Sequence, residues 1–249
     1  MHNSVVGDGL PIRARSPDAW RYSARILDAI GYGIGLWLLL WPEPYKFAVV
    51  SAMTAFLAAL AIEMLLRQRL GLADPRRGDQ RPRIQMLFVM PALALALRAL
   101  LDINLLDWRP VLVWSLAPAA LLAVPLFAGD RDLPKRPLIA AILLVLNYAY
   151  SWGAIVEANS IFDTSAPHHF QTTIRAMHAN RGKSTSYHLV LGPWNGRPAG
   201  DDVRVPYAAY AGRRPGDTIC VTLSDGWLGF RYYAARSCWV VLPPGHEAG

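Results

Sequence analysis

The sequence predicts an α-helical membrane bundle of five transmembrane helices, followed by a small antiparallel β sandwich or barrel. Three observations lead to this prediction. Five long apolar runs lie between residues 26 and 156, positive charges gather in alternate loops, and short alternating strands follow in the last third. We therefore expect an N-terminal cytoplasmic segment over 1–25, a transmembrane domain over 26–156 and an extracytoplasmic β domain over 157–249.

The first 25 residues are polar and carry four arginines. A cleaved signal peptide would place a short apolar run near the start and a small-residue cleavage site behind it. Here the first apolar run begins only near Ile26 and ends in WLLLWPEPYK, where we find no such site. We therefore expect this run to remain as the first span.

Each of the five apolar runs is close to the roughly 20 residues that a helix needs to cross a hydrocarbon core. Only helices and closed barrels can cross, because the backbone finds no water there. The runs lack the two-residue alternation of barrel strands, and the shortest, the first, could extend into the overlapping YSARILDA. The predicted spans are residues 26–41, 47–66, 84–101, 110–128 and 137–156.

Lysine and arginine are distributed unevenly between the loops. Residues 1–25 carry four, 67–83 carry six and 129–136 carry three, whereas the alternate loops carry one each, Lys46 and Arg109. Positive charge in short loops marks the cytoplasmic side, so we predict a cytoplasmic N-terminus and a C-terminal domain on the outside. Lysine is rare beside arginine and alanine is abundant, which is typical of a GC-rich bacterial genome, so we expect the bacterial inner membrane and a periplasmic C-terminal domain. Because the arginines sit in these loops, the net charge of +7 does not indicate a nucleic-acid partner.

The residues after 156 are rich in proline, glycine and tyrosine and form short alternating runs. In TICVTL, for example, Ile219, Val221 and Leu223 would share one face of a half-buried antiparallel strand. NRGK, WNGRPAGD, RRPGD and SDGW separate the runs as turn signals, and Asp-Gly favours a tight hairpin. Five or six such strands predict a small sandwich or barrel.

Arg98 lies in the third apolar run near its outer end, and Asp102 follows four residues later, close enough on a helix to be a neighbour. Three interpretations are open: an arginine whose head reaches the interface, an Arg98–Asp102 pair that closes the helix end, or a site for an anion or lipid headgroup. The position near an end favours a boundary role. We keep both residues as candidate lipid or anion contacts.

Glu157, at the outer end of the fifth run, is the third candidate lipid or anion contact. It is followed by Asn159 and Asp163 in a polar segment that could seat the tail on the bundle. In the middle of the same run, the amide of Asn147 is expected to tie two helices together.

We expect no metal site, no cofactor and no catalytic residue. Asp163, His168 and His169 come nearest to a metal set, but adjacent histidines point different ways on a strand and no spacing fits a zinc pattern. We also find no G-x-S-x-G, H-E-x-x-H or phosphate-binding loop in the sequence.

Cys220 and Cys238 are the only two cysteines, and both lie in the segment predicted to be outside. An oxidising compartment permits a disulfide. A hairpin about Asp225-Gly226 would set Cys220 opposite Arg231, so Cys238 would have to lie on the next strand. A disulfide and two independent thiols are both open.

A series of motifs runs through the tail: N-x-x-x-D at Asn159 and Asp163, YHLVLGPW, Y-x-x-Y at Tyr207 and Tyr210, PGD, and DGWLGFRYY. In this pattern the tail resembles the C-terminal extracytoplasmic β modules of bacterial multi-span membrane proteins that have no assigned function. The resemblance implies the same arrangement of a bundle and an outer β module. It brings no activity and no functional residue with it.

These observations favour a non-enzymatic envelope protein whose periplasmic β domain binds a partner or ligand. The expected partners are the lipid bilayer and an envelope protein. The alternative is a membrane-embedded enzyme or transporter that uses the polar outer ends of the third and fifth helices. The span centres are nearly free of charge, which counts against an ion-coupled transporter.

Overall fold

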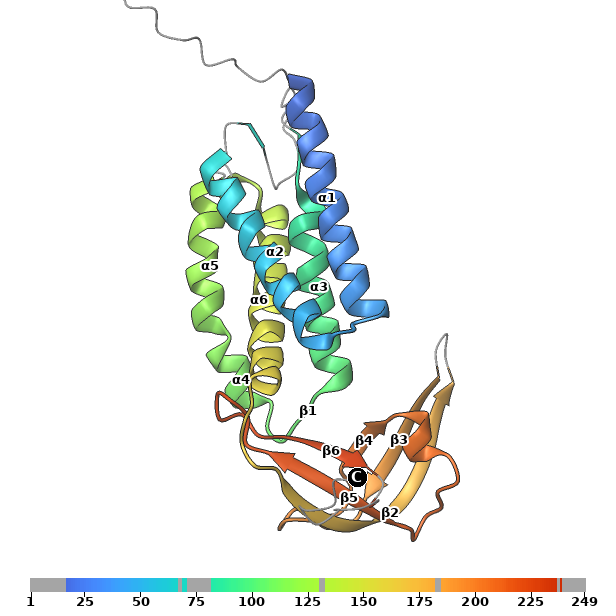
Figure 1. Cartoon of the computed structure of the whole chain (residues 1–249). Helices are drawn as coiled ribbons and strands as arrows, with labels where there is room; N and C mark the ends of the chain where they lie inside the picture. Colours follow the sequence, from blue (N-terminus) through green and yellow to red (C-terminus); the bar gives the residue numbers. More distant parts are fainter. Residues whose placement is uncertain are drawn as a thin grey trace, which may run out of the picture.

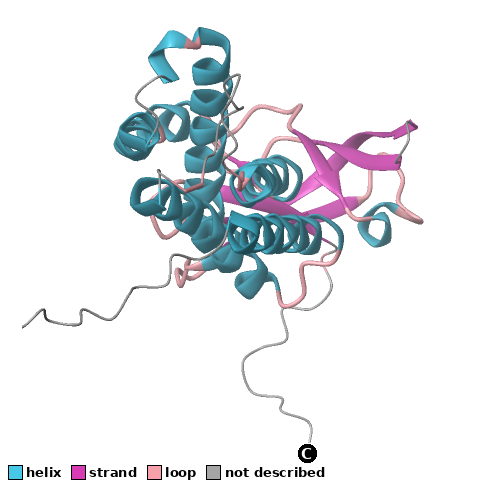
Figure 2. Ribbon diagram, turned by 90° about the horizontal axis from the view of Figure 1, so that it is seen from above, coloured by secondary structure: helices cyan, strands magenta, loops and turns pink. Residues whose placement is uncertain are grey.

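The helices form an elongated bundle, and the strands gather at one end of it (Figure 1). Seen from above, the sheet passes beneath the helices and extends beyond one side of the bundle (Figure 2). The structure is a computed structural model, and it describes residues 17–66, 69–70, 82–129, 133–181, 185–236 and 238.

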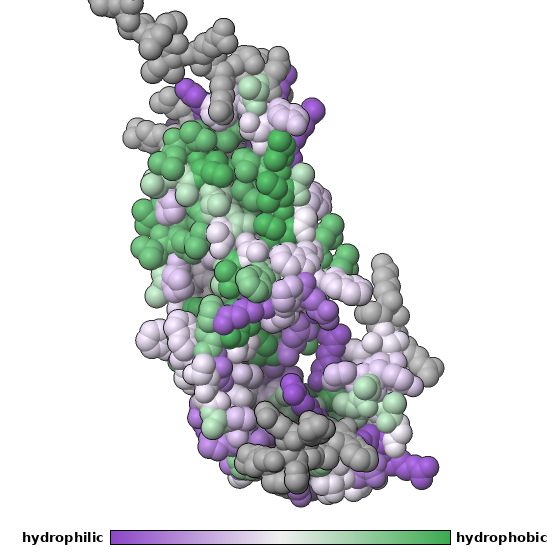
Figure 3. All heavy atoms as spheres, viewed as in Figure 1, coloured by the Kyte–Doolittle hydropathy of each residue, from purple (hydrophilic) through white to green (hydrophobic). Residues whose placement is uncertain are grey.

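Within the described residues, five helical segments of the bundle are long and apolar enough to cross a membrane, in the order predicted from the sequence. Large apolar side chains cover much of the outside of the bundle, and the space-filling view shows them as an apolar belt (Figure 3). The bundle helices are α1 (Pro17–Leu40), α2 (Tyr45–Leu66), α3 (Gln85–Asp102), α4 (Arg109–Trp114), α5 (Leu116–Gly129) and α6 (Pro137–Ile161), with a short 3-10 helix, η1 (Leu133–Lys135), before α6.

The first and fourth helical segments differ most from the prediction in their bounds. Helix α1 begins at Pro17, well before Ile26, because the fixed φ of proline suits the first position of a helix. The fourth span is divided at Ser115 into α4 and α5. Pro118 has no N–H for the carbonyl of Trp114, and its ring crowds that carbonyl, which interrupts the helix there.

Helix α3 packs against α1, α2 and α6. Two glycines permit the closest approaches. A Cβ at Gly31 of α1 would collide with the backbone of Leu87, and a Cβ at Gly153 of α6 would collide with the backbone of Leu95. Small residues let membrane helices pack closely without a hydrophobic driving force between them.

Two further contacts join α2, α3, α5 and α6. The ring of Phe56 stacks on Phe88 and on Tyr150, with centroids 4.4 and 3.7 Å apart. The prediction for Asn147 is confirmed, because its Nδ2 donates to the carbonyl of Ala119 at 2.7 Å and so ties α6 to α5.

Among the described residues, the strands of the β domain form one six-stranded antiparallel sheet with the order β1-β6-β5-β2-β3-β4. It curls so that β4 also contacts β6, which is close to a barrel. The predicted alternation in β5 is confirmed, since Ile219, Val221 and Leu223 are all buried. The elements are β1 (Asn104–Leu105), β2 (His168–Arg181), β3 (Thr185–Leu191), β4 (Asp202–Val205), α7 (Tyr207–Tyr210), β5 (Thr218–Ser224) and β6 (Tyr232–Arg236).

Strand β2 closes the sheet on itself. Its first half, His168 to Thr173, pairs with β5, and its second half, from Ile174 on, pairs with β3. A register shift between Ile174 and Ala176 separates the two halves. Irregularities of this kind bend a strand and increase its twist, so β2 can belong to both sides of the curled sheet.

Strand β1 comes from the loop between α3 and α4, not from the tail. Asn104 pairs with Tyr233 and Leu105 with Tyr232, and the next N–H, of Leu106, donates to Arg231 at 2.8 Å. The bundle therefore supplies an edge strand of the β domain, which the predicted division at residue 157 does not include.

The hairpin between β5 and β6 is wider than the sequence predicts. Ser224 pairs with Tyr232, so residues 225–231 form an open loop rather than a two-residue turn at Asp225-Gly226. As a result Cys220 pairs with Arg236, not with Arg231. The reason lies in the contacts that α6 makes with this loop.

Candidate functional site

Asn159, near the end of α6, binds loop 225–231 through both ends of its amide. Its Nδ2 donates to the carbonyl of Phe230 at 2.7 Å, and its Oδ1 accepts from the N–H groups of Leu228 and Phe230 at 2.9 and 3.3 Å. The backbone carbonyl of Asn159 accepts from Trp227 at 2.9 Å. Because Asn159 is fully buried, these bonds hold the loop in one conformation.

Asp163 extends this contact. Its Oδ2 accepts from the N–H of Gly226 and the hydroxyl of Tyr232, both at 3.2 Å, and its Oδ1 accepts from the N–H of Ser165 at 2.8 Å. Burial acts to raise the pKa of Asp163, but the hydrogen bonds from Ser165, Tyr232 and Gly226 together lower it below its ordinary value. We call the contacts of Asn159 and Asp163 with loop 225–231 the junction.

Arg197 attaches the domain at another place. Its Nη1 donates to the carbonyl of Leu106 at 3.4 Å, while its Nε and Nη2 bind the two carboxylate oxygens of Asp201 at 2.8 Å each. The hydrogen bond from Arg197 lowers the pKa of Asp201, against the effect of burial and with the help of Trp194. With β1 and the junction, this contact fixes the β domain against the bundle at three places.

A cleft lies between the C-terminal end of α3 and the β domain, where the space-filling view is hollowed and hydrophilic (Figure 3). Two cavities of about 390 and 470 Å³ share Asp102, Arg204 and Pro206 as lining residues. The first also touches β3, and the second touches β1, α7 and β6. Each volume falls in the range of small-molecule sites.

The charge of this cleft is positive. Arg204 of β4 and Arg236 of β6 are exposed and line it, and within the described part of the chain neither has a carboxylate partner. The acidic group of the lining, Asp102, is already paired with Arg98 at 2.9 Å. The cleft therefore presents two guanidinium groups, which match the geometry of carboxylate and phosphate.

Arg98 binds the end of helix α1. Its Nε donates to the carbonyl of Leu38 at 2.7 Å and its Nη2 to that of Leu39 at 2.9 Å, while Nη1 pairs with Asp102. The last carbonyls of a helix have no partner within the helix and carry partial negative charge. Arg98 thus caps α1 and forms the pair with Asp102, and its side chain is only 17% exposed.

Glu157 is wholly buried, and each of its carboxylate oxygens lies 2.9 Å from the hydroxyl of Tyr45. Tyr45 begins α2, so this contact ties α2 to α6 at the end of the bundle that lies next to the β domain. Arg98 and Asp102 lie within electrostatic range of the pair. The structure therefore brings the three candidate residues to one end of the bundle, but only Asp102 lines the cleft.

Asp163, His168 and His169 do not gather as a metal set. Asp163 belongs to the junction, His168 lies 3.7 Å from Asp225, and His169 lies 3.4 Å from the hydroxyl of Thr222. Among the described residues, His178, His188 and Asp202 form a closer group, which sequence reasoning missed. The two histidines lie five residues before and five residues after position 183, so they face each other once the register of β2 and β3 is known, but the turn signal NRGK does not fix that register.

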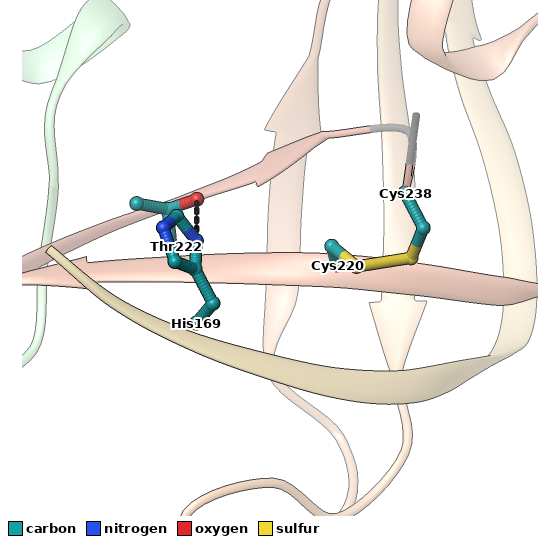
Figure 4. Close-up of a disulfide and its surroundings, with 4 residues drawn as sticks. All are labelled: His169, Cys220, Thr222 and Cys238. Atoms are coloured by element: carbon teal, nitrogen blue, oxygen red, sulfur yellow. Dashed lines mark hydrogen bonds between the residues drawn. A yellow bond between two sulfur atoms is a disulfide. The ribbon is translucent and has the colours of Figure 1, made fainter. Parts of the chain in front are cut away.

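Cys220 and Cys238 form a disulfide (Figure 4). Cys220 lies on β5 opposite Arg236 of β6, and Cys238 follows two residues later. The bridge therefore links β5 to the chain where it leaves β6, without the additional strand that the sequence reasoning required.

Sequence reasoning also missed Arg204 and Arg236, because arginines in a short exposed strand carry no sign of what they face. The three candidates that it named, Arg98, Asp102 and Glu157, stand out in the sequence as charges at the ends of apolar runs. In the structure, the side chains of Arg98 and Glu157 hold helices together.

No known protein family matches this chain, and neither does any curated protein or solved structure.

Proposed function

We propose that this chain is a non-enzymatic protein of the bacterial inner membrane, with its N-terminus in the cytoplasm and its β domain in the periplasm. The β domain binds an anionic group of a ligand or envelope partner in the cleft against the bundle. The observation that carries the proposal is the pair of exposed guanidinium groups of Arg204 and Arg236 in that cleft, neither of which has a carboxylate partner among the residues that the structure describes.

The fixed placement of the β domain supports this role. A site between two parts of a chain keeps its shape only if the parts do not move against each other. Here β1, the junction and the Arg197–Leu106 bond hold the walls in place. The cleft also lies at the end of α3, where the apolar belt ends, so an anionic group at the membrane surface could reach it.

The alternative function, an enzyme or transporter that uses the outer ends of the third and fifth spans, receives less support. Glu157 is fully buried, and its carboxylate accepts the hydrogen bond of Tyr45. The guanidinium of Arg98 donates to the carbonyls of Leu38 and Leu39 and to the carboxylate of Asp102. These groups stabilise helix contacts and are not available to a substrate.

A phosphatase reporter that is active only outside the cytoplasm tests the orientation. Fused after Gly249, it is expected to be active, and inserted within 67–83 it is expected to be inactive, because the positively charged loops stay inside. Immunoblots should show equal amounts of both fusions. The reverse pattern would contradict the orientation, and activity at both sites would contradict the count of five spans.

Photo-crosslinking tests the cleft. A photoreactive residue in place of Tyr207, which lines the cleft and is 62% exposed, is expected to capture the bound molecule in native membranes. Arg204→Gln together with Arg236→Gln should reduce this product about tenfold, which corresponds to a loss of about 1.4 kcal/mol of binding free energy.

Two controls accompany this experiment. Arg175→Gln removes a guanidinium from an exposed position of β2 that does not line the cleft, and it should leave the product unchanged. A photoreactive residue at exposed Thr218 should not give the product. If the double variant Arg204→Gln and Arg236→Gln gave as much crosslinked product as the wild type, the proposed anion site would be disproved.

A further inference from the structure

His178, His188 and Asp202 gather on the outer face of the β2–β3–β4 part of the sheet. His178 pairs directly with His188 across the two strands, so both side chains leave the same face. Asp202 lies on the neighbouring strand β4 and reaches both rings. One ligand atom from each residue lies within 4.8 Å of the others.

The spacing of these atoms fits one small metal ion. His178 Nε2 lies 3.3 Å from Asp202 Oδ2, and His188 Nδ1 lies 3.1 Å from Asp202 Oδ1. Tetrahedral zinc, bound at about 2.0–2.1 Å by nitrogen and oxygen, holds its ligand atoms about 3.4 Å apart. Each ring nitrogen therefore lies at about this separation from one of the two oxygens of the Asp202 carboxylate.

Ser186 supplies the contact that orients a metal-binding histidine. Its hydroxyl lies 3.2 Å from Nε2 of His188. If His188 donates its Nε2–H there, Nδ1 carries a lone pair that faces the carboxylate of Asp202, and a cation between the two relieves their repulsion. Histidines that bind metals usually donate their second ring N–H in this way.

The two rings stack at 5.0 Å between centroids, with their planes 13° apart. To point at one ion they must turn about χ2, a torsion with a broad and shallow preference in histidine. Since His178 and Asp202 are 41% and 46% exposed at their side chains, there is room for this turn and a path for the ion.

We infer that His178, His188 and Asp202 form a surface site for a divalent transition-metal ion of the zinc class, with a fourth position open to water or to a ligand. Two imidazoles and one carboxylate suit zinc, and they do not suit magnesium, which prefers oxygen ligands. Arg204 lies opposite His188 on the same face of the sheet. The inference reverses the expectation of no metal site and does not depend on the proposed cleft function.

Equilibrium dialysis of the full-length, tag-free protein in detergent against Zn²⁺ tests the site. One zinc ion per chain is expected to bind, and an excess of Mg²⁺ should not displace it. His178→Ala and His188→Ala should each weaken binding more than tenfold. Asp202→Asn, which keeps the shape of the side chain, should also weaken it, and Ser186→Ala should weaken it about tenfold through the orientation of His188.

The matched control is the double variant His168→Ala and His169→Ala, which removes two histidines from the same strand β2. It should bind zinc like the wild type. The proposal is overturned if the wild type binds no zinc at a stoichiometry near one, if His188→Ala keeps the wild-type affinity, or if the control variant loses binding as the site variants do.

Discussion

Replacing Asn159 by leucine is expected to destabilise the attachment of the β domain by about 3 kcal/mol or more. The leucine fills a similar volume but leaves the N–H groups of Leu228 and Phe230 and the carbonyl of Phe230 without partners. An unsatisfied buried polar group costs about 1–3 kcal/mol. Limited proteolysis of the full-length protein in detergent should show earlier cleavage within loop 225–231.

Ser160→Ala is the control on the same turn of α6, because within the described residues the Ser160 hydroxyl bonds only the carbonyl of Glu157 in its own helix. It should change the cleavage rate little. Equal protection of Asn159→Leu and wild type would show that the amide does not hold the loop.

A pair of glycine variants examines the junction from the loop side. Gly226 and Gly229 both have positive φ, +79° and +81°, so alanine is strained at either position. At Gly226 the added Cβ would also collide with the side chain of Asn159, whereas at Gly229 it meets nothing within 4 Å. Gly226→Ala should therefore increase proteolytic cleavage of loop 225–231 clearly more than Gly229→Ala does. Equal cleavage of the two variants would contradict the proposed contact between Asn159 and the loop.

The bundle could be predicted from the sequence because each apolar helix satisfies its own backbone, so its position follows from local composition. The second predicted span, 47–66, differs from α2 by only two residues at its start. The fifth differs more, since α6 continues past residue 156 to Ile161. Glu157 and Asn159 are polar yet buried there, because Tyr45 and loop 225–231 satisfy them in place of water.

The β domain could be predicted only in part. Alternation identified β5, because its buried and half-buried residues follow one another strictly. Strand β1 could not be found this way, since two residues carry no period and their partner lies far along the chain. The open loop 225–231 was missed for a related reason. Asp-Gly favours a tight turn locally, but Asn159 and Asp163 offer hydrogen bonds that no local pattern reveals.

The same distinction applies to the candidate site. Arg98 was visible as a charge in an apolar run, but its partners are the backbone carbonyls of Leu38 and Leu39, and carbonyls have no signature in a sequence. Arg204 lies in the ordinary alternating strand DVRV and becomes a cleft residue only because β4 packs near the end of α3. Sites made by distant segments need the fold before they can be recognised.

Serine in place of either Cys220 or Cys238 is expected to lower the free energy of unfolding of the β domain by about 3 kcal/mol. The disulfide joins residues 18 positions apart, and the chain-entropy model gives about that value for a loop of this size. This is a large share of the roughly 5–15 kcal/mol that stabilises a typical domain. Because either substitution removes the same bond, the double variant should be no less stable than each single variant.

The measurement uses the full-length protein in detergent, because β1 comes from the bundle and a tail fragment would lack it. Proteolysis pulses at increasing urea concentrations report the folded fraction. Thr222→Ser changes a residue on the same face of β5 and should resemble the wild type. A reductant should lower the free energy of unfolding of the wild type to that of Cys220→Ser and leave the stability of this variant unchanged. If the double variant instead lost the sum of the two single losses in free energy of unfolding, the two cysteines would act independently. The stability of the domain would then rest on its strands alone.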